Sequence, residues 1–481
     1  MTTLLRNETP RRCAFWRGAR GILAFVLALA LTIQGVAPAW AFLGLGGFTI
    51  KDEVELGRKF DVLIKSRMPL VEDPEVKVYV QDIVARLLEQ APPQPFDFKT
   101  NVLLHNSLNA FASPGGFIFV HTGLVMQMDH EAEVAGVLAH ELAHATQRHI
   151  AGRIEKMQTT SILSMAGALA GAFLGGGSGK GAAMAGSIAA GQSAMLNYSR
   201  VDETEADEIG LRYLIAAGFR PEGMVGAFEK IRKKQWAMGT DIPSYLSTHP
   251  AVNERINSLS ARIAALPADI RSRPNDDARF LRVRTICRAR YGDPAVSERL
   301  FADAPAGDCL AQLGKAILFS RQNRVAEATA AFDKALQCSP KDQLIWREAG
   351  RFHYTKGDKG RAAAMLQRAT LMNPDDYMAL FFYARLLADS GQPQKSYQYF
   401  DEVLRRLPED AEVHYYYGRV LGASGQPFKA YLHLAYSSLY SNDKHKTESF
   451  EEQARAQART PEEMAELERF AATYQERKAF W

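Results

Sequence analysis

A chain of 481 residues is longer than one ordinary domain, so two or three folding units are expected. Hydrophobic residues make up 47% and charged residues 23%, which is typical of globular proteins and excludes collagen-like, disordered and many-span membrane proteins. The formal net charge of +4 falls to zero without the segment from Met1 to Ala41, which carries five arginines and one glutamate. The sequence therefore offers no concentrated basic face, and no nucleic-acid partner is expected.

The segment from Met1 to Ala41 has the layout of a secretory signal peptide. Arginines precede an uncharged apolar run from Gly21 to Ile33, and the segment ends in Ala39-Trp40-Ala41. A membrane anchor is the alternative, but the run falls short of the roughly 20 residues that span a bilayer. We therefore expect cleavage after Ala41 and export to the periplasm.

The segment from 42 to 265 mixes helical stretches with a strand-like run, Phe117–Val120, which follows the turn Pro114-Gly115-Gly116. This pattern predicts one α+β domain. The strand offers a free edge to an extended substrate, or it is an ordinary internal strand; both interpretations fit its residues.

A helix is predicted from Glu131 to His149, because apolar residues recur there at helical spacing. His140 and His144 are one turn apart on one face, so both imidazoles can reach one ion. Glu141 is rotated by about 100° and can touch a metal-bound water without binding the metal. Zinc suits such ligands and keeps one position open for water. The pattern predicts one Zn²⁺ per chain and peptide-bond hydrolysis with Glu141 as the base; two satisfied histidines on a packed helix are the alternative.

A second acidic helical segment follows. Glu203 and Asp207 are four residues apart and share a face, so one can bind a metal while the other hydrogen-bonds a ligand histidine. An ordinary acidic helix start is the alternative. Between the two helices, residues 162–196 are rich in Gly and Ala and almost free of charge. They predict a helical hairpin packed on its own domain, or a lid or hairpin that makes peripheral contact with a membrane.

Residues 266–308 are charged and dotted with prolines, which is typical of a connecting region. From 309 to 481, two residue types recur at one shared and constant spacing: Pro340, Pro374 and Pro408, and Gly357, Gly391 and Gly425. This period resembles the tetratricopeptide repeat and predicts stacked helix pairs, an architecture whose concave surface holds peptides or partner proteins.

Three cysteines follow the expected signal peptide, so at most one intrachain disulfide can form. Cys287 with Cys309 is a plausible pair near a domain junction. Three reduced thiols, with Cys338 as the third, fit the sequence equally well.

Several motifs together resemble the M48 family of zinc peptidases. They are His-Glu-x-x-His at 140–144, Glu-x-x-x-Asp at 203–207, Asn109-Ala110-Phe111-Ala112 and Pro114-Gly115-Gly116. The resemblance implies a mostly α (α+β) fold, with a zincin-like domain that has a small sheet, followed by an α-solenoid of repeats. It also implies that His140, His144 and Glu203 bind the zinc, that Glu141 is the base and that Asp207 is a second catalytic carboxylate, a proton donor.

The run Ser247-Thr248-His249-Pro250, with Arg255 beyond it, extends the resemblance. It implies that His249 can cap the zinc in a resting state. A neutral imidazole can fill the fourth position and displace the water, or move aside and steady the oxyanion. A surface histidine before a proline is the alternative.

The expected function is that of an exported zinc metalloendopeptidase and chaperone. It would hold unfolded or stalled polypeptides on the repeats and cleave them. By resemblance to the family, its clients are outer-membrane β-barrel proteins and its partner on the repeats is the machinery that assembles them. A second hypothesis is a chaperone or assembly scaffold whose His-capped peptidase site is largely silent.

Overall fold

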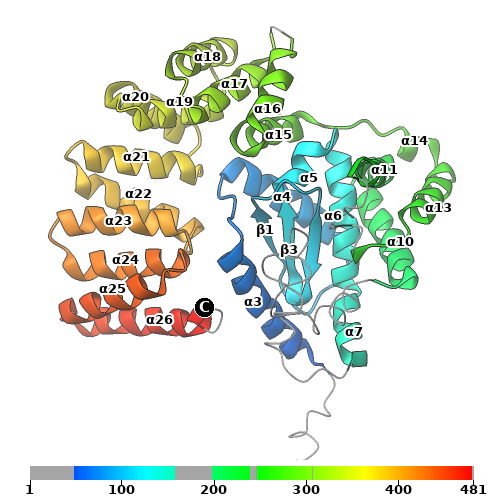
Figure 1. Ribbon diagram of the computed structural model, residues 1–481, viewed down its shortest axis with the longest axis horizontal. Helices are drawn as coiled ribbons and strands as arrows, with labels where there is room; N and C mark the ends of the chain where they lie inside the picture. Colours follow the sequence, from blue (N-terminus) through cyan, green and yellow to red (C-terminus); the bar gives the residue numbers. More distant parts are fainter. Residues whose placement is uncertain (1–47, 158–197, 239–244, 246–247, 306, 479–481) are drawn as a thin grey trace, which may run out of the picture.

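The computed structural model describes residues 48–157, 198–238, 245, 248–305 and 307–478 (Figure 1). The expected signal peptide and the Gly-rich stretch 162–196, with its lid and membrane alternatives, lie outside these residues. None of the helices in the described part of the chain has the length and apolar character of a membrane span.

The first part of the chain packs helices around a small sheet (Figure 1). Its helices are α3 (Ile50–Arg67), α4 (Pro74–Leu88), α5 (Thr122–Gln127), α6 (Glu131–Thr146), α7 (His149–Met157), α10 (Arg200–Ala216), α11 (Glu222–Met238), α13 (Val252–Ala264) and α14 (Ala268–Arg271). Its strands are β1 (Lys99–Leu103), β2 (Ala110–Ser113) and β3 (Phe117–His121). The predicted mostly helical fold with a small sheet is confirmed.

The three strands lie in the order β1-β3-β2. Strand β3 pairs in parallel with β1 and antiparallel with β2, with Phe119 opposite Phe111. The idea that Phe117–Val120 offers a free edge is therefore wrong, because both of its edges are already hydrogen-bonded. The short link between β2 and β3 explains why β2 covers one edge of β3. Gly115 and Gly116 adopt φ values of 73° and 83° there and reverse the chain from β2 directly onto β3.

Helix α6 is the central helix of this domain and is buried along nearly its whole length. Glycines let its neighbours approach closely. A Cβ on Gly210 of α10 would lie 3.0 Å from backbone atoms of Ala139 and His140, and one on Gly136 would lie 2.6 Å from Met224 Cα. The close approach of α10 to α6 places the acidic residues of α10 beside the histidines of α6.

The rest of the chain is helical. It comprises α15 (Ala278–Tyr291), α16 (Pro294–Ala302), α17 (Cys309–Arg321), α18 (Val325–Cys338), α19 (Gln343–Thr355), α20 (Lys359–Met372), α21 (Tyr377–Asp389), α22 (Pro393–Arg406), α23 (Ala411–Ala423), α24 (Pro427–Tyr440), α25 (Lys444–Gln457) and α26 (Pro461–Lys478). The periodic glycines follow α19, α21 and α23, the first helices of three successive pairs, with φ values of 83°, 78° and 76°, a conformation that favours glycine. A third periodic set, missed in the sequence, caps the starts of α17, α19, α21 and α23: Asp308, Asp342, Asp376 and Asp410.

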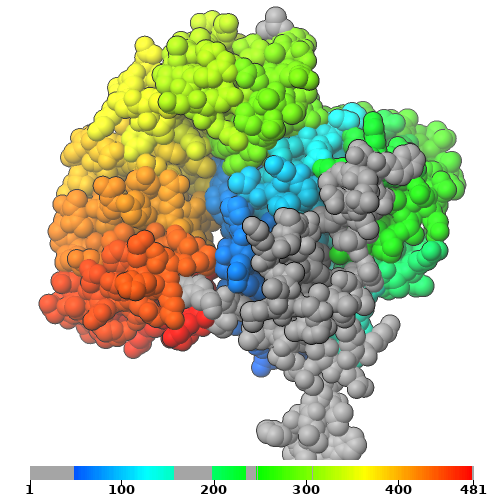
Figure 2. Space-filling view, viewed as in Figure 1, coloured from blue at the N-terminus to red at the C-terminus, as the bar shows by residue number. Residues whose placement is uncertain are grey.

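The helix pairs form an arc that curves back onto the first domain (Figure 1). At the start of the arc, Arg347 of α19 contacts Asp73, the N-cap residue of α4, at 3.2 Å. At its far end, α26 lies beside α3 (Figure 1), where Arg58 pairs with Glu476. Figure 2 shows the helices of the arc beside the first domain in a space-filling view. The arc is thus held to the first domain at both ends.

The cysteines pair differently from either expectation. Cys309 and Cys338 form a disulfide with a Cα–Cα distance of 5.6 Å, and Cys287 is a free, buried thiol. Both the Cys287–Cys309 pairing and the three-thiol alternative are therefore wrong. The physical reason is local, because Cys309 begins α17 and Cys338 ends α18, and the two ends of an antiparallel helix pair adjoin.

Candidate metal centre

Four buried side chains from three separate segments converge in the first domain. His140 and His144 come from α6, Glu203 from the first turn of α10, and His249 from the residues that precede α13. One ligand atom from each lies within 4.8 Å of all the others. The structure thus brings together all four residues that the sequence analysis named as ligands or as a cap.

Neighbouring ligand atoms of the cluster lie about as far apart as the ligands of one zinc ion. Bonds of about 2.0–2.1 Å place ligands of a tetrahedral zinc roughly 3.3 Å apart. Nε2 of His140 lies 3.0 Å from Nε2 of His144 and 3.3 Å from Nδ1 of His249. Oε1 of Glu203 lies 2.9 Å from Nδ1 of His249 and 3.4 Å from Nε2 of His144. The donor set, three imidazoles and one carboxylate, is one that zinc binds.

The protonation states also favour a cation. Burial, followed by the positive charge of Arg255, lowers the pKa of His140 to about 4, and burial holds the pKa of His144 well below its ordinary value. Both imidazoles are therefore neutral near pH 7 and keep a lone pair for a metal. Burial alone would raise the pKa of Glu203, but His249 and Arg255 hold it well below its usual range, so this group is a carboxylate.

Glu141 is fully buried beside the four-residue cluster and next to the edge strand β2. Burial raises its pKa to about 7, although nearby His249 and the backbone N–H of Ala112 favour the charged form. Its Oε1 lies 3.5 Å from Nε2 of His249. A carboxylate with a pKa near 7 is well matched to general-base catalysis at neutral pH.

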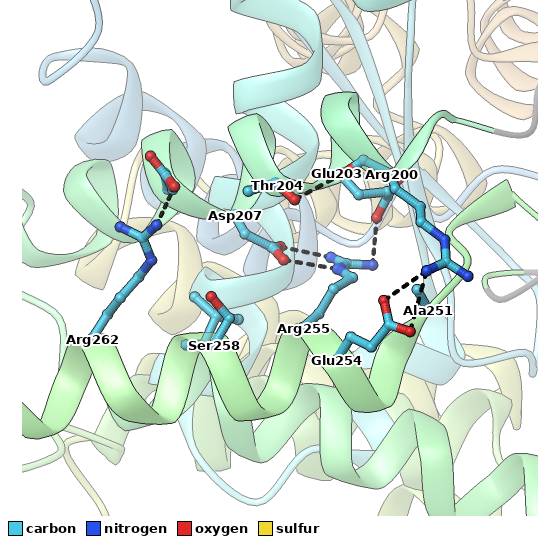
Figure 3. Close-up of a pocket in the computed structure, with 11 residues that line it drawn as sticks. Arg200, Glu203, Thr204, Asp207, Ala251, Glu254, Arg255, Ser258 and Arg262 are labelled. Carbon is cyan, nitrogen blue, oxygen red and sulfur yellow. Dashed lines mark hydrogen bonds and ion pairs between the residues drawn. The ribbon is translucent and has the colours of Figure 1, made fainter.

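Asp207 lies behind the histidines and orients one of them. Its Oδ1 is 3.0 Å from Nδ1 of His140, so this ring presents Nε2 to the other ligands. Arg255 holds the carboxylate of Asp207 through Nε and Nη2, at 2.8 and 2.7 Å, and also pairs with Glu203 at 2.5 Å (Figure 3). Its guanidinium lies 4.3 Å from the ring centre of Phe228. This role of Arg255 is not visible in the sequence, because its partners lie on another helix, α10.

Replacing Arg255 with methionine is expected to weaken zinc binding by about 10–100-fold. The reason is that Asp207, which orients His140, and Glu203 both lose the cation that holds them. Competition with a chelator measures the affinity. Arg262→Met is the matched control, since Arg262 lies on the same helix but forms an exposed pair with Glu208. Equal affinities for the two variants, with both folded by circular dichroism, would contradict this role.

His249 is only 1% exposed, so the alternative of a surface histidine is wrong. Its ring stacks on Tyr245 at 4.4 Å between ring centres, and the ring of Tyr198 lies 5.0 Å away. Another contact was missed in the sequence: Nδ1 of His149 lies 2.7 Å from Nδ1 of His144. His149 thus supports a ligand histidine from outside the cluster.

Comparisons with known proteins agree with this geometry. Residues 72–263 match the model of peptidase family M48, and residues 347–411 match that of the tetratricopeptide repeat. The chain is 27% identical to the β-barrel assembly-enhancing protease of Escherichia coli (strain K12) over 391 residues, 78% of this chain and 80% of the relative.

Two further comparisons each cover one part of the chain. The mitochondrial metalloendopeptidase OMA1 of Schizosaccharomyces pombe is 31% identical over 185 residues, 38% of this chain and 51% of that protein. The solved structure of YrrB, a tetratricopeptide-repeat protein, covers 33% of this chain and 84% of its own, with 21% identity and a TM-score of 0.29. The chain thus combines a zinc metallopeptidase domain of family M48 with tetratricopeptide repeats.

Proposed function

We propose that His140, His144 and Glu203 bind the zinc of an exported endopeptidase, with a peptidase domain over 42–265, a connecting region over 266–308 and a repeat array over 309–481. The observation that carries the proposal is the convergence of these buried ligands within 4.8 Å of one another, beside a carboxylate whose pKa is about 7. Zinc in this site would supply Lewis-acid polarisation of the scissile carbonyl and acidify a water.

The remaining steps belong to the side chains. Glu141 accepts the proton of the attacking water and delivers it to the leaving amine. Asp207 holds His140 in the orientation that binds the metal, and through this contact it steadies the reacting groups. The geometry thus supports an orienting role for Asp207 rather than direct proton donation, because its carboxylate is already held by Arg255.

We further propose that the enzyme works in the periplasm on stalled outer-membrane β-barrel proteins. The likeness to the β-barrel assembly-enhancing protease of E. coli supports the client class, and the repeat array supports a holding role and a protein partner in barrel assembly. Export is supported by the layout of the segment from Met1 to Ala41 and by the Cys309–Cys338 disulfide, since disulfides persist in oxidising compartments.

A chaperone or scaffold with a silent site is the second candidate. The observation that favours it is the position of His249, whose Nδ1 occupies the fourth corner of the cluster. In that position the imidazole would hold the place that a water needs, and hydrolysis would require His249 to leave.

The two candidates differ in the expected effect of His249→Ala. If His249 caps the zinc, the variant cleaves casein severalfold faster than wild type with unchanged metal content, because the fourth position opens to water. Tyr198→Phe is the control for a small change beside the cluster, since it keeps both His249 and the neighbouring ring and removes only a hydroxyl. Slower cleavage in His249→Ala would show that the imidazole serves the reaction instead. Purified protein that holds no zinc, together with variants that cleave nothing, would remove the peptidase proposal.

A further inference from the structure

Four residues other than glycine have a positive φ in the part of the chain that the structure describes. Two of them are asparagines, which adopt this conformation readily, and the other two are Arg148 and Ala251, with φ values of 54° and 62°. Arg148 directly precedes His149, and Ala251 follows His249 after one proline, so both adjoin the metal cluster. Strained backbone of this kind persists only where the surrounding structure imposes it, and it gathers at functional sites.

The left-handed turn at Arg148 decides where His149 points. On an uninterrupted helix, residues five apart are rotated by about 500°, which leaves them about 140° from one another. An α6 that continued through Arg148 would therefore carry residue 149 away from the ring of His144. Instead the turn separates α6 from α7, and Nδ1 of His149 comes to lie 2.7 Å from Nδ1 of His144.

This contact fixes the state of a ligand ring. Nε2 of His144 faces the other ligand atoms and lies 3.0 Å from Nε2 of His140. A ligand imidazole carries its proton on the nitrogen that points away from the metal, so Nδ1 of His144 donates to Nδ1 of His149. The side chain of His149 is only 7% exposed. A buried acceptor thus sets both the tautomer and the orientation of His144.

A buried ion pair holds the turn from another helix. Nε of Arg148 donates to Oε2 of Glu53, on α3, at 2.7 Å, and the side chain of Glu53 is only 3% exposed. Burial raises the pKa of Glu53, but Arg148 and the backbone N–H of Gly115 favour its charged form. Nη2 of Arg148 is buried without a hydrogen-bond partner among the described residues, so the bond through Nε is what anchors this side chain.

Glu53 has a rigid base, because α3 packs closely on the turn that follows β2. A Cβ on Gly57 would lie 2.0 Å from the carbonyl oxygen of Pro114, and one on Gly115 would lie 3.0 Å from the carbonyl oxygen of Glu53. Neither contact leaves room for α3 to shift. The position of Glu53 is therefore set by the sheet, and through Arg148 it is passed to the end of α6.

We propose that Glu53 and Arg148 are positioning residues of the metal centre, which hold His149 against the ligand His144 through the left-handed turn. The inference rests on the proposed peptidase function and adds a support that reaches the zinc ligands from α3. It also accounts for the strained backbone, because a glycine at position 148 would allow the turn but leave it without an anchor. Both residues act through His149, so they are not catalytic residues.

The test measures zinc affinity of the full chain by competition with a chelator. Glu53→Gln keeps the shape of the side chain and removes its charge, and it is expected to weaken zinc binding about tenfold. Glu55→Gln is the matched control on the same helix, because Glu55 pairs with Lys59 at the surface, and its affinity is expected to equal that of the parent. Arg148→Lys keeps a cation for Glu53 and is expected to lose less affinity than Arg148→Gln.

A purely structural role of Glu53 is separated by a second background, His149→Phe, which removes the acceptor of His144. If Glu53 acts through His149, Glu53→Gln weakens zinc binding by less than about twofold there, because residues in one chain of contacts are not additive. An equal loss in both backgrounds, or no loss in the parent background, would overturn the inference. A parent that binds zinc and cleaves casein supports the peptidase proposal whatever Glu53→Gln does, whereas a parent without zinc would overturn both.

Discussion

Glu141→Gln is expected to lower kcat/KM for peptide hydrolysis by about 10²–10⁴-fold while the enzyme keeps its zinc. Glutamine has nearly the same shape as glutamate and fits the same buried position, but it cannot accept the proton of the attacking water. The ligands His140, His144 and Glu203 are untouched, so metal content stays near one per chain. Initial rates on casein and metal analysis on the same sample measure both quantities.

Glu205→Gln is the control for this prediction. It makes the same chemical change on α10, at a side chain that is 49% exposed. The carboxylate of Glu205 lies 3.4 Å from His149 and belongs to neither the ligands nor the base. Its rate is expected to stay close to that of wild type. If Glu141→Gln hydrolyses casein as fast as this control, Glu141 is not the base. If it loses its zinc instead, its carboxylate supports the metal site rather than the proton transfer.

The parts of the site that sequence could predict are those set by one helix. His140 and His144 face the same way because residues four apart on a helix always do. Their convergence with Glu203 and His249 joins segments that are far apart in the chain, and residue spacing does not encode that approach. The resemblance to a family supplied those partners. It did not supply the contacts of Arg255, which depend on how α13 packs against α10.

In the repeat array, too, local features could be predicted from the sequence and contacts between distant segments could not. Its period is visible in the sequence because three successive repeats have the same glycine with positive φ, and the four aspartate caps carry the same period. The strand order and the Cys309–Cys338 disulfide depend on which ends of helices and strands lie together in space. From the sequence, the place of Phe117–Val120 in the sheet stayed open, and the expected cysteine pairing was wrong. The return of the arc onto the first domain also depends on distant contacts.

The junction at the start of the arc contains a buried ionic network. Arg347 is fully buried and contacts Asp73, Glu348 and Asp376 at 2.9–3.3 Å. Although burial opposes it, the positive charge of Arg290 and Arg347 lowers the pKa of Glu348 from 4.5 to about 2. The folded pKa lies below the unfolded one, so this contribution to stability is present above about pH 4.5 and is lost as the pH falls toward 2.

Arg347→Met is expected to lower the free energy of unfolding by about 3–5 kcal/mol at pH 7, since it leaves the buried Asp376 without its cation and leaves Asp73 and Glu348 with Arg290 alone. Urea denaturation followed by circular dichroism measures the change. Arg406→Met is the matched control, because Arg406 forms an exposed pair with Asp375 and such pairs contribute at most about 1 kcal/mol. Equal midpoints for the two variants would mean that water or rearrangement satisfies the carboxylates. A larger loss at pH 7 than at pH 3 is the second signature, because Glu348 without the charge of Arg347 takes up a proton more readily at pH 3, whereas it stays charged at pH 7.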